Sequence, residues 1–118
     1  MHGGKLLGSV GLENFTTKEW RTVQRPAVFS RIGADPCTSW LPPELARDEK
    51  GFIKTGAAVA NEPLWQICGR APSPLETSVP GVFAAGDVRS GSIKRCAAAV
   101  GEGGMAIAGV QESLSFVV

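Results

Sequence analysis

The sequence predicts a small, β-rich unit of the α/β class, with an α+β organisation as the alternative, that ends in one long helix. Short segments of strand-like composition, separated by a turn, occupy residues 5–32. The 118 residues include 15 glycines and 8 prolines, and their clustering in residues 33–81 predicts sparse regular structure there. Apolar residues spaced three and four apart over residues 92–114 predict the helix.

At the N-terminal end, residues 5–13 are expected to form a strand. The turn that follows contains Asn14, whose side chain can hydrogen-bond to nearby backbone groups. Residues 20–32 begin with an alternating pattern and continue into an apolar run. That pattern fits either two strands in a hairpin or one strand interrupted at Pro26.

The middle of the chain is expected to be irregular. Residues 33–45 are expected to form a loop, and a polar turn at 48–51 precedes a short strand at 52–55. Residues 57–78 contain three prolines and are also expected to be loop.

Towards the C-terminus, residues 82–85 are expected to form a short buried strand. Ser92 is the expected N-cap of the helix over 92–114. Glycines at 101, 103 and 104 would weaken an isolated helix by roughly 1 kcal/mol each. Such a cost is usually offset where another backbone or a ligand approaches closely.

Composition argues against several classes of function. Twelve Lys and Arg against eleven Asp and Glu leave a formal net charge of +1, so no bulk charge favours nucleic acid or a membrane surface. No apolar run approaches the roughly 18 residues of a membrane span, and the first residues lack the apolar core of a signal peptide. Three isolated cysteines without a CxxC predict reduced thiols and no metal site. We therefore expect a cytoplasmic protein.

Gly86 and Asp87 stand between the last predicted strand and the helix. Open α/β sheets bind ligands at the carboxyl ends of their strands, and a helix N-terminus favours anionic groups. A carboxylate only accepts hydrogen bonds, so it suits a hydroxyl-rich part of a ligand. A dinucleotide offers both features. The alternative is that Asp87 only caps the helix or the turn.

Residues 77–107, TSVPGVFAAGDVRSGSIKRCAAAVGEGGMAI, resemble the C-terminal flavin-binding segment of thioredoxin reductase-like pyridine nucleotide–disulfide oxidoreductases. The family pattern T-x-x-P-G-[IV]-[FY]-A-[AI]-G-D is followed by a turn and an Ala/Gly-rich helix containing G-[ED]-G. Residues 32–41, IGADPCTSWL, resemble the family's crossover from the nicotinamide-nucleotide domain to the flavin domain. Order and spacing agree over residues 27–114.

The resemblance implies a site for FAD formed by Gly86, Asp87, Lys94, Arg95 and Cys96. Asp87 matches the aspartate that binds the ribityl chain, and residues 94–96 match the helix start beside the isoalloxazine pyrimidine edge. Arg95 departs from the common glutamine and resembles a subgroup with a GSxKR turn. The alternative for Lys94 and Arg95 is a solvated helix start. Cys96 takes a position usually held by small apolar residues, so a buried inert thiol is expected.

The chain lacks other parts that a complete enzyme of this family uses. Neither G-x-G-x-x-G loop nor a CxxC is present, and GEGG at 101–104 lies within the predicted helix, where it cannot act as a phosphate loop. We therefore predict a fragment of an FAD-dependent NAD(P)H oxidoreductase that contributes the flavin-binding Gly-Asp and helix, with residual or no FAD binding by itself. It is expected to have no catalytic residue of its own and to be inactive alone. NADP would bind only through a missing domain. The alternative is a non-enzymatic, self-associating or partner-binding module without flavin.

Residues 1–118 are expected to form a single partial FAD/NAD(P)-binding-like, Rossmann-like domain. Residues 5–32 would be a β-hairpin remnant of the nucleotide domain, and residues 33–114 the flavin segment. The strand at 82–85 would be left with unpaired edges. This predicts a homo-oligomer, most simply a dimer, or a complementary larger chain, as in a split flavoenzyme.

Overall fold

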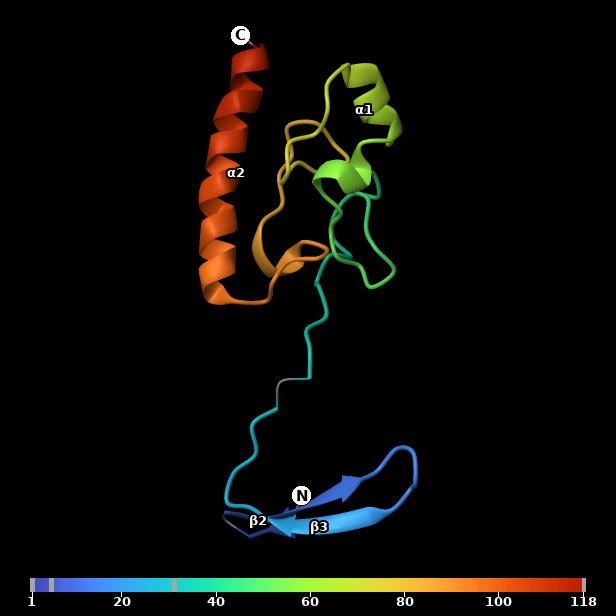
Figure 1. Ribbon diagram of the computed structural model, residues 1–118, viewed down its shortest axis with the longest axis vertical. Helices are drawn as coiled ribbons and strands as arrows, with labels where there is room; N and C mark the ends of the chain where they lie inside the picture. The colour runs from blue at the N-terminus through green and yellow to red at the C-terminus, as the bar shows by residue number, and fades with distance from the viewer. Residues whose placement is uncertain (1, 5, 31, 118) are drawn as a thin grey trace. The chain divides into compact units, whose positions relative to one another are not determined.

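The computed structural model describes residues 2–4, 6–30 and 32–117 and contains two compact units, Met1–Gly33 and Ala34–Val118 (Figure 1). The first is a small sheet, and the second combines a long helix with irregular segments. This agrees with the predicted small β-rich fold ending in one long helix. The single partial domain over residues 1–118 stays a prediction.

The first unit is an antiparallel sheet in the order β1-β2-β3, formed by β1 (His2–Gly3), β2 (Leu7–Glu13) and β3 (Trp20–Gln24). The strand predicted at 5–13 is confirmed as β2. The Asn14 carboxamide oxygen accepts hydrogen bonds from the backbone N–H groups of Thr16 and Thr17, at 2.9 and 3.2 Å, and these bonds form the predicted turn. Because β3 ends before Pro26 and no strand follows in the described residues up to 33, the interrupted-strand alternative holds.

The second unit contains two short 3₁₀ turns, η1 (Gly56–Val59) and η2 (Gly86–Val88), and two helices, α1 (Pro63–Cys68) and α2 (Cys96–Val117). The loop predicted at 57–78 is therefore wrong in part. Pro63 occupies the first position of α1, where its missing N–H costs no hydrogen bond, and Gly69 ends the helix at φ 72°. These prolines and glycines delimit a helix rather than exclude one.

The two short strands predicted in this unit are reduced to single bridges. Ile53 bridges to Arg47 and Arg89, and Phe83 bridges to Glu76. The buried strand at 82–85 is also wrong in its burial, since Val82 is 40% exposed. The physical reason is that this segment has one hydrogen-bonded neighbour. Apart from the turn hydrogen bond from the Val82 N–H to the Val79 carbonyl, its hydrogen bonds run to residues 75 and 77, and none from Phe83 to another segment is found in the described chain.

α2 begins at Cys96, four residues after the predicted start, and Ser92 is not its N-cap. Residues 89–95 instead form a turn, in which the Ser92 N–H donates to the carbonyl of Arg89 at 3.3 Å. The described chain makes no close approach to Gly101, Gly103 or Gly104. A Cβ at any of them would have no atom of another segment within 4 Å. The close approach occurs at Gly109, where such a Cβ would lie 2.7 Å from the Phe83 ring. None of the helices in the described part of the chain has the length and apolar character needed to cross a membrane.

The core of the second unit lies around α1 and the segment that follows it. Its buried apolar side chains are Leu45, Ile53, Val59, Trp65 and Leu75. Three consecutive polar residues, 76–78, are buried beside them. The Trp65 indole N–H donates to the Thr77 carbonyl at 2.9 Å, which satisfies a polar atom that burial removes from water.

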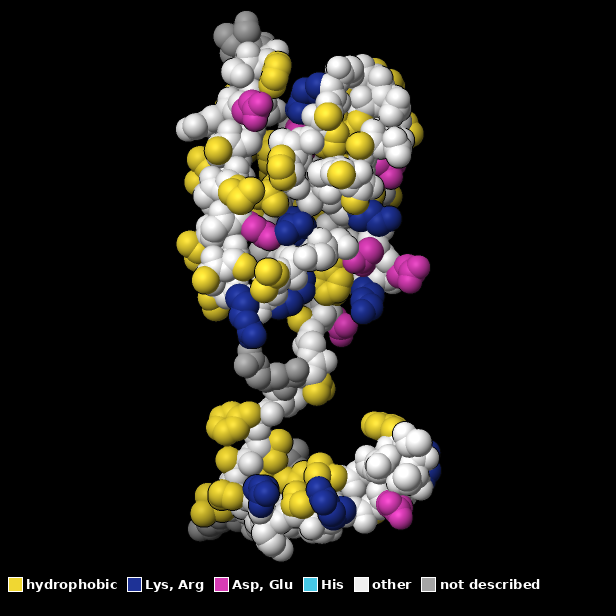
Figure 2. All heavy atoms as spheres, viewed as in Figure 1, with side chains coloured by type: hydrophobic (Ala, Val, Ile, Leu, Met, Phe, Trp, Pro, Cys, Tyr) yellow, Lys and Arg dark blue, Asp and Glu magenta, His cyan; other side chains and the backbone are white. Residues whose placement is uncertain are grey.

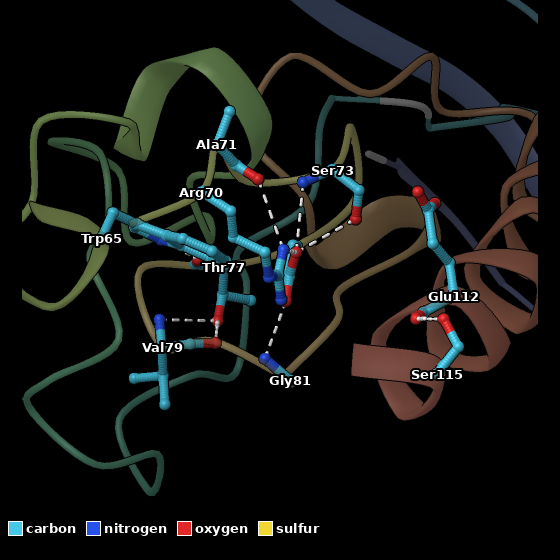
Figure 3. Close-up of polar contacts among 10 residues, drawn as sticks. Trp65, Arg70, Ala71, Ser73, Thr77, Val79, Gly81, Glu112 and Ser115 are labelled. Atoms are coloured by element: carbon cyan, nitrogen blue, oxygen red, sulfur yellow. Dashed lines mark hydrogen bonds and ion pairs between the residues drawn. The ribbon is translucent and has the colours of Figure 1, made fainter. Parts of the chain in front are cut away.

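Glu76 is a fully buried carboxylate that is held by five donor groups. The residues that supply them, Arg70, Ser73 and Gly81, are labelled in Figure 3. The Arg70 guanidinium donates to both oxygens at 2.7 and 2.8 Å, and the Gly81 N–H donates at 2.8 Å. The N–H and hydroxyl of Ser73 each donate at 3.1 Å. Burial alone would raise the pKa of Glu76, but Arg70 and these N–H groups outweigh it and lower the pKa from 4.5 to about 2.

Glu76 should make the stability of the second unit depend on pH. Because its folded pKa lies below its unfolded value, its contribution is complete above pH 4.5 and is lost as the pH falls towards 2. The lowered pKa corresponds to about 3 kcal/mol. Glu76→Gln should lower the free energy of unfolding at pH 7 by a similar amount and flatten its pH dependence between 4.5 and 2.

Urea unfolding followed by circular dichroism across this pH range would measure both effects. Glu49→Gln, which changes an exposed carboxylate, is the matched control and should leave the curve unchanged. Equal pH dependence in wild type and Glu76→Gln would contradict the role given to Glu76.

Candidate functional site

The five candidate residues lie between residues 86 and 96, on the turn that consists of η2 and residues 89–95 and on the first residue of the helix that follows it. Gly86 and Asp87 belong to η2, Lys94 and Arg95 lie in the turn before α2, and Cys96 is the first residue of α2. The backbone of this turn is bonded to the segment around residue 53, whose N–H donates to the carbonyl of residue 88 at 2.9 Å and whose carbonyl accepts from residue 90 at 2.8 Å.

Gly86 is buried and has φ 77°, in the left-handed region where a side chain would be strained. A Cβ at this position would also lie 3.4 Å from the Ala99 Cβ, so α2 packs directly on the turn. The Gly86 N–H donates to the Glu102 carboxylate at 2.7 Å. Gly86 therefore turns the chain out of its extended course and directs its amide towards α2.

Glu102 forms an ion pair with Arg89 that the sequence analysis did not anticipate. The Arg89 Nε donates to the Glu102 oxygen that also binds Gly86, at 3.1 Å, and its Nη2 donates to the other oxygen. The hydrogen bond from Arg89 lowers the pKa of Glu102, and Glu102 raises the pKa of Arg89. The available signal was the Gly-Glu-Gly pattern, together with an opposite charge just after Gly86-Asp87.

Lys94 is engaged within the turn. Its ammonium donates to the Asp87 carbonyl at 2.6 Å, to the Ser92 hydroxyl at 2.7 Å and to the Arg89 carbonyl at 3.3 Å. It also lies 4.2 Å from the centroid of the Phe52 ring. The Lys94 ammonium thus satisfies two backbone carbonyl groups, those of Asp87 and Arg89.

The Asp87 side chain is exposed, and its carboxylate makes no hydrogen bond or ion pair with the part of the chain that the structure describes. It caps neither η2 nor α2 there, although its backbone carbonyl is held by Lys94. A free carboxylate on a fixed backbone can accept hydrogen bonds from a hydroxyl-bearing ligand.

Arg95 and Cys96 are both exposed at the start of α2. The expectation that Cys96 is buried is therefore wrong, because the described chain places no layer over this end of the helix. Together, the exposed residues present one carboxylate and one guanidinium beside the N-terminus of a 22-residue helix. This donor set fits a ligand that carries hydroxyl groups and a partial negative charge.

No protein-family model matches the chain. It is similar to the thioredoxin reductase of Yarrowia lipolytica, with 35% identity over 103 residues, which are 87% of this chain and 28% of that protein. The thioredoxin reductase of Chlamydia pneumoniae is 34% identical over 101 residues, 86% of this chain and 28% of that protein.

The fold is similar to that of a solved thioredoxin reductase from Streptococcus pyogenes, with a TM-score of 0.61 and 28% identity. That match covers 97% of this chain and 32% of the solved chain. The chain thus spans roughly a third of the length of the relatives it matches. Over nearly all its residues, the chain is therefore similar in sequence and fold to part of a thioredoxin reductase-like protein, which has a Rossmann-like FAD/NAD-binding fold.

Proposed function

We propose that this chain supplies the ribityl-contacting part of the flavin site in a thioredoxin reductase-like, FAD-dependent oxidoreductase. The observation that carries the proposal is the free Asp87 carboxylate on a turn whose backbone is fixed on both sides. We further propose that the chain is not active alone. NADPH and the flavin pyrophosphate would be bound by a segment that carries the two dinucleotide loops.

The residues of the turn fit the chemistry of this ligand. Asp87 would accept hydrogen bonds from ribityl hydroxyl groups. FAD, when bound, supplies the hydride and electron chemistry of the reaction. The N-terminus of α2 and the Arg95 guanidinium would favour negative charge at the pyrimidine edge of the isoalloxazine. Cys96 lies beside them, and no catalytic role is assigned to it.

The partner in this proposal is a complementary larger chain that covers α2. The helix has two charged residues and is apolar on most sides, which is typical of a helix buried in a protein interior. Figure 2 nevertheless shows apolar side chains at the surface along α2. Its exposed large apolar residues are Val100, Met105, Ile107, Val110, Leu114 and Phe116. An exposed apolar patch of this kind marks an interaction surface.

The same surface favours a second candidate function, a self-associating module without flavin. A second copy of the chain could cover α2 in a homodimer. The three free cysteines agree with a reducing compartment, so a cytoplasmic location is part of either proposal. Binding of FAD distinguishes the two functions.

The flavin proposal predicts that the chain forms a flavin-containing, and therefore coloured, complex with a thioredoxin reductase that lacks the matching segment. The chain would be mixed with the Yarrowia lipolytica thioredoxin reductase lacking the matched residues and with FAD, and the visible spectrum recorded across a sizing column. A flavin spectrum should elute with both polypeptides. Asp87→Ala should weaken FAD affinity by roughly tenfold, because one or two hydrogen bonds to a charged group are lost.

The melting temperature of the Asp87→Ala chain should change little, because the carboxylate makes no contact within the described chain. Glu49→Ala is the matched control. A colourless, discrete dimer that added FAD leaves unchanged would instead favour the self-associating module.

The association surface gives a separate prediction. Ile107→Glu introduces a charge on the exposed side of α2 and should prevent association with the partner or a second copy, because the charge would be buried unpaired. Asn61→Glu, at an exposed polar position outside α2, is the control. Light scattering after size exclusion measures the masses, and identical masses for wild type and both variants would exclude this face as the contact.

A further inference from the structure

We propose that Glu102 is a positioning residue, which fixes the turn that presents Asp87 to its ligand. This inference rests on the proposed function for the identity of the ligand. The contacts that carry it lie on both sides of the turn and involve Glu102, Arg89 and Lys94.

The first contact is the hydrogen bond from the Gly86 N–H to Glu102. The bridge between Glu76 and Phe83 ends with the Ala84 N–H, which donates to the carbonyl of residue 75 at 2.9 Å. Two residues later the chain turns at Gly86, whose buried N–H donates a hydrogen bond to the Glu102 carboxylate at 2.7 Å. A buried N–H without an acceptor is costly, so the carboxylate determines where this amide points.

The second contact fixes the carboxylate itself. Arg89 donates through two nitrogens to the two oxygens of Glu102, and both side chains are more than three-quarters buried, at 21% and 14% exposed. Arg89 also closes η2, because its backbone N–H donates to the Gly86 carbonyl at 3.1 Å. The Glu102 carboxylate on α2 therefore binds Gly86, the first residue of η2, and Arg89, the residue after η2.

The third contact acts on the carbonyl side. Lys94 binds the carbonyls of Asp87 and Arg89, so the backbone of Asp87 is held between an anion on α2 and a cation in the turn. The Asp87 carboxylate takes no part in this network. Binding sites are effective when a ligating group stands on a backbone that its neighbours have already fixed. Glu102 thereby acts on the ligand through Asp87 and does not touch it.

The test combines two variants of the full chain with two readouts. Glu102→Ala removes both acceptor oxygens, whereas Glu102→Gln keeps one oxygen for the Gly86 N–H and replaces the other, which accepts from Arg89, by an NH2 group. Hydrogen exchange of the Gly86 amide, measured by NMR on the chain alone, reports on the turn. FAD affinity, measured in the mixture with the truncated Yarrowia lipolytica protein, reports on the ligand.

Glu102→Ala should speed Gly86 exchange by about tenfold or more and weaken FAD affinity by about tenfold, as expected for loss of a hydrogen bond to a charged group. Exchange at residue 77, in the core, should not change. Glu102→Gln should recover part of both effects, because it keeps an acceptor for the Gly86 N–H. Glu112→Ala, on the same helix and away from the turn, should match wild type in both readouts.

Two results overturn the inference. One is wild-type Gly86 exchange and FAD affinity in Glu102→Ala. The other is an equal increase in exchange at residues 77 and 86, which would make Glu102 a stability residue only. If Glu102→Ala does not fold, Arg89→Lys tests the same ion pair, since lysine keeps the positive charge and loses the bidentate contact with Glu102.

Failure of the proposed function gives a distinct result. Wild-type chain that binds no FAD in the mixture, while Gly86 exchange responds to Glu102→Ala as expected, would overturn the flavin site and the ligand role of Glu102 with it. Unchanged Gly86 exchange overturns the positioning role whatever the flavin result.

Discussion

The second unit depends on the buried carboxylate of Glu76. A carboxylate without exposed surface must have its oxygens satisfied, and the groups that satisfy this one come from residues 70–81. Arg70, its counter-charge, lies between two aromatic rings, 4.8 Å from the centroid of Trp65 and 5.5 Å from that of Phe116. One ion pair therefore connects α1, the irregular segment after it and the C-terminal end of α2.

The candidate site depends on this arrangement through the backbone. Residues 75 and 77, on either side of Glu76, make the hydrogen bonds that hold the extended segment at 82–85. That segment ends at Gly86, whose amide is taken up by Glu102. The Arg70–Glu76 ion pair thus holds the segment that leads to Gly86, and the Arg89–Glu102 ion pair holds the turn that follows. Both connect irregular segments to α2. The described residues of this unit form isolated bridges but no strand, and its apolar core is small. These two carboxylates therefore connect segments that a sheet would connect in a larger domain.

Some of the fold could be predicted from local pattern, and the remainder depends on contacts that leave no such pattern. β2, the Asn14 turn and the long C-terminal helix follow from periodicity and turn chemistry. The start of α2 does not, because residues 89–95 form a turn in which Lys94 donates to the Asp87 carbonyl and the Ser92 hydroxyl, contacts that local spacing does not indicate. Glu76 and Glu102 are no more predictable, since their partners are set by tertiary structure. The motif placed Gly86 and Asp87 on one turn with α2. It also contains Glu102 and Arg89, but their spacing alone does not show that the two side chains meet.

The exposed side of α2 and the free carboxylate of Asp87 follow from one cause in our proposal. Both belong to the same helix and its preceding turn, and both lack a partner in the described chain. A polypeptide that covers α2 would also stand beside its N-terminus and supply the remaining groups of a dinucleotide site. Ligand binding and association would then be linked, because a ligand that binds only the assembled state stabilises it according to the ratio of ligand concentration to Kd. FAD would strengthen the complex, and loss of the apolar contact would weaken FAD binding, without either acting directly on the other.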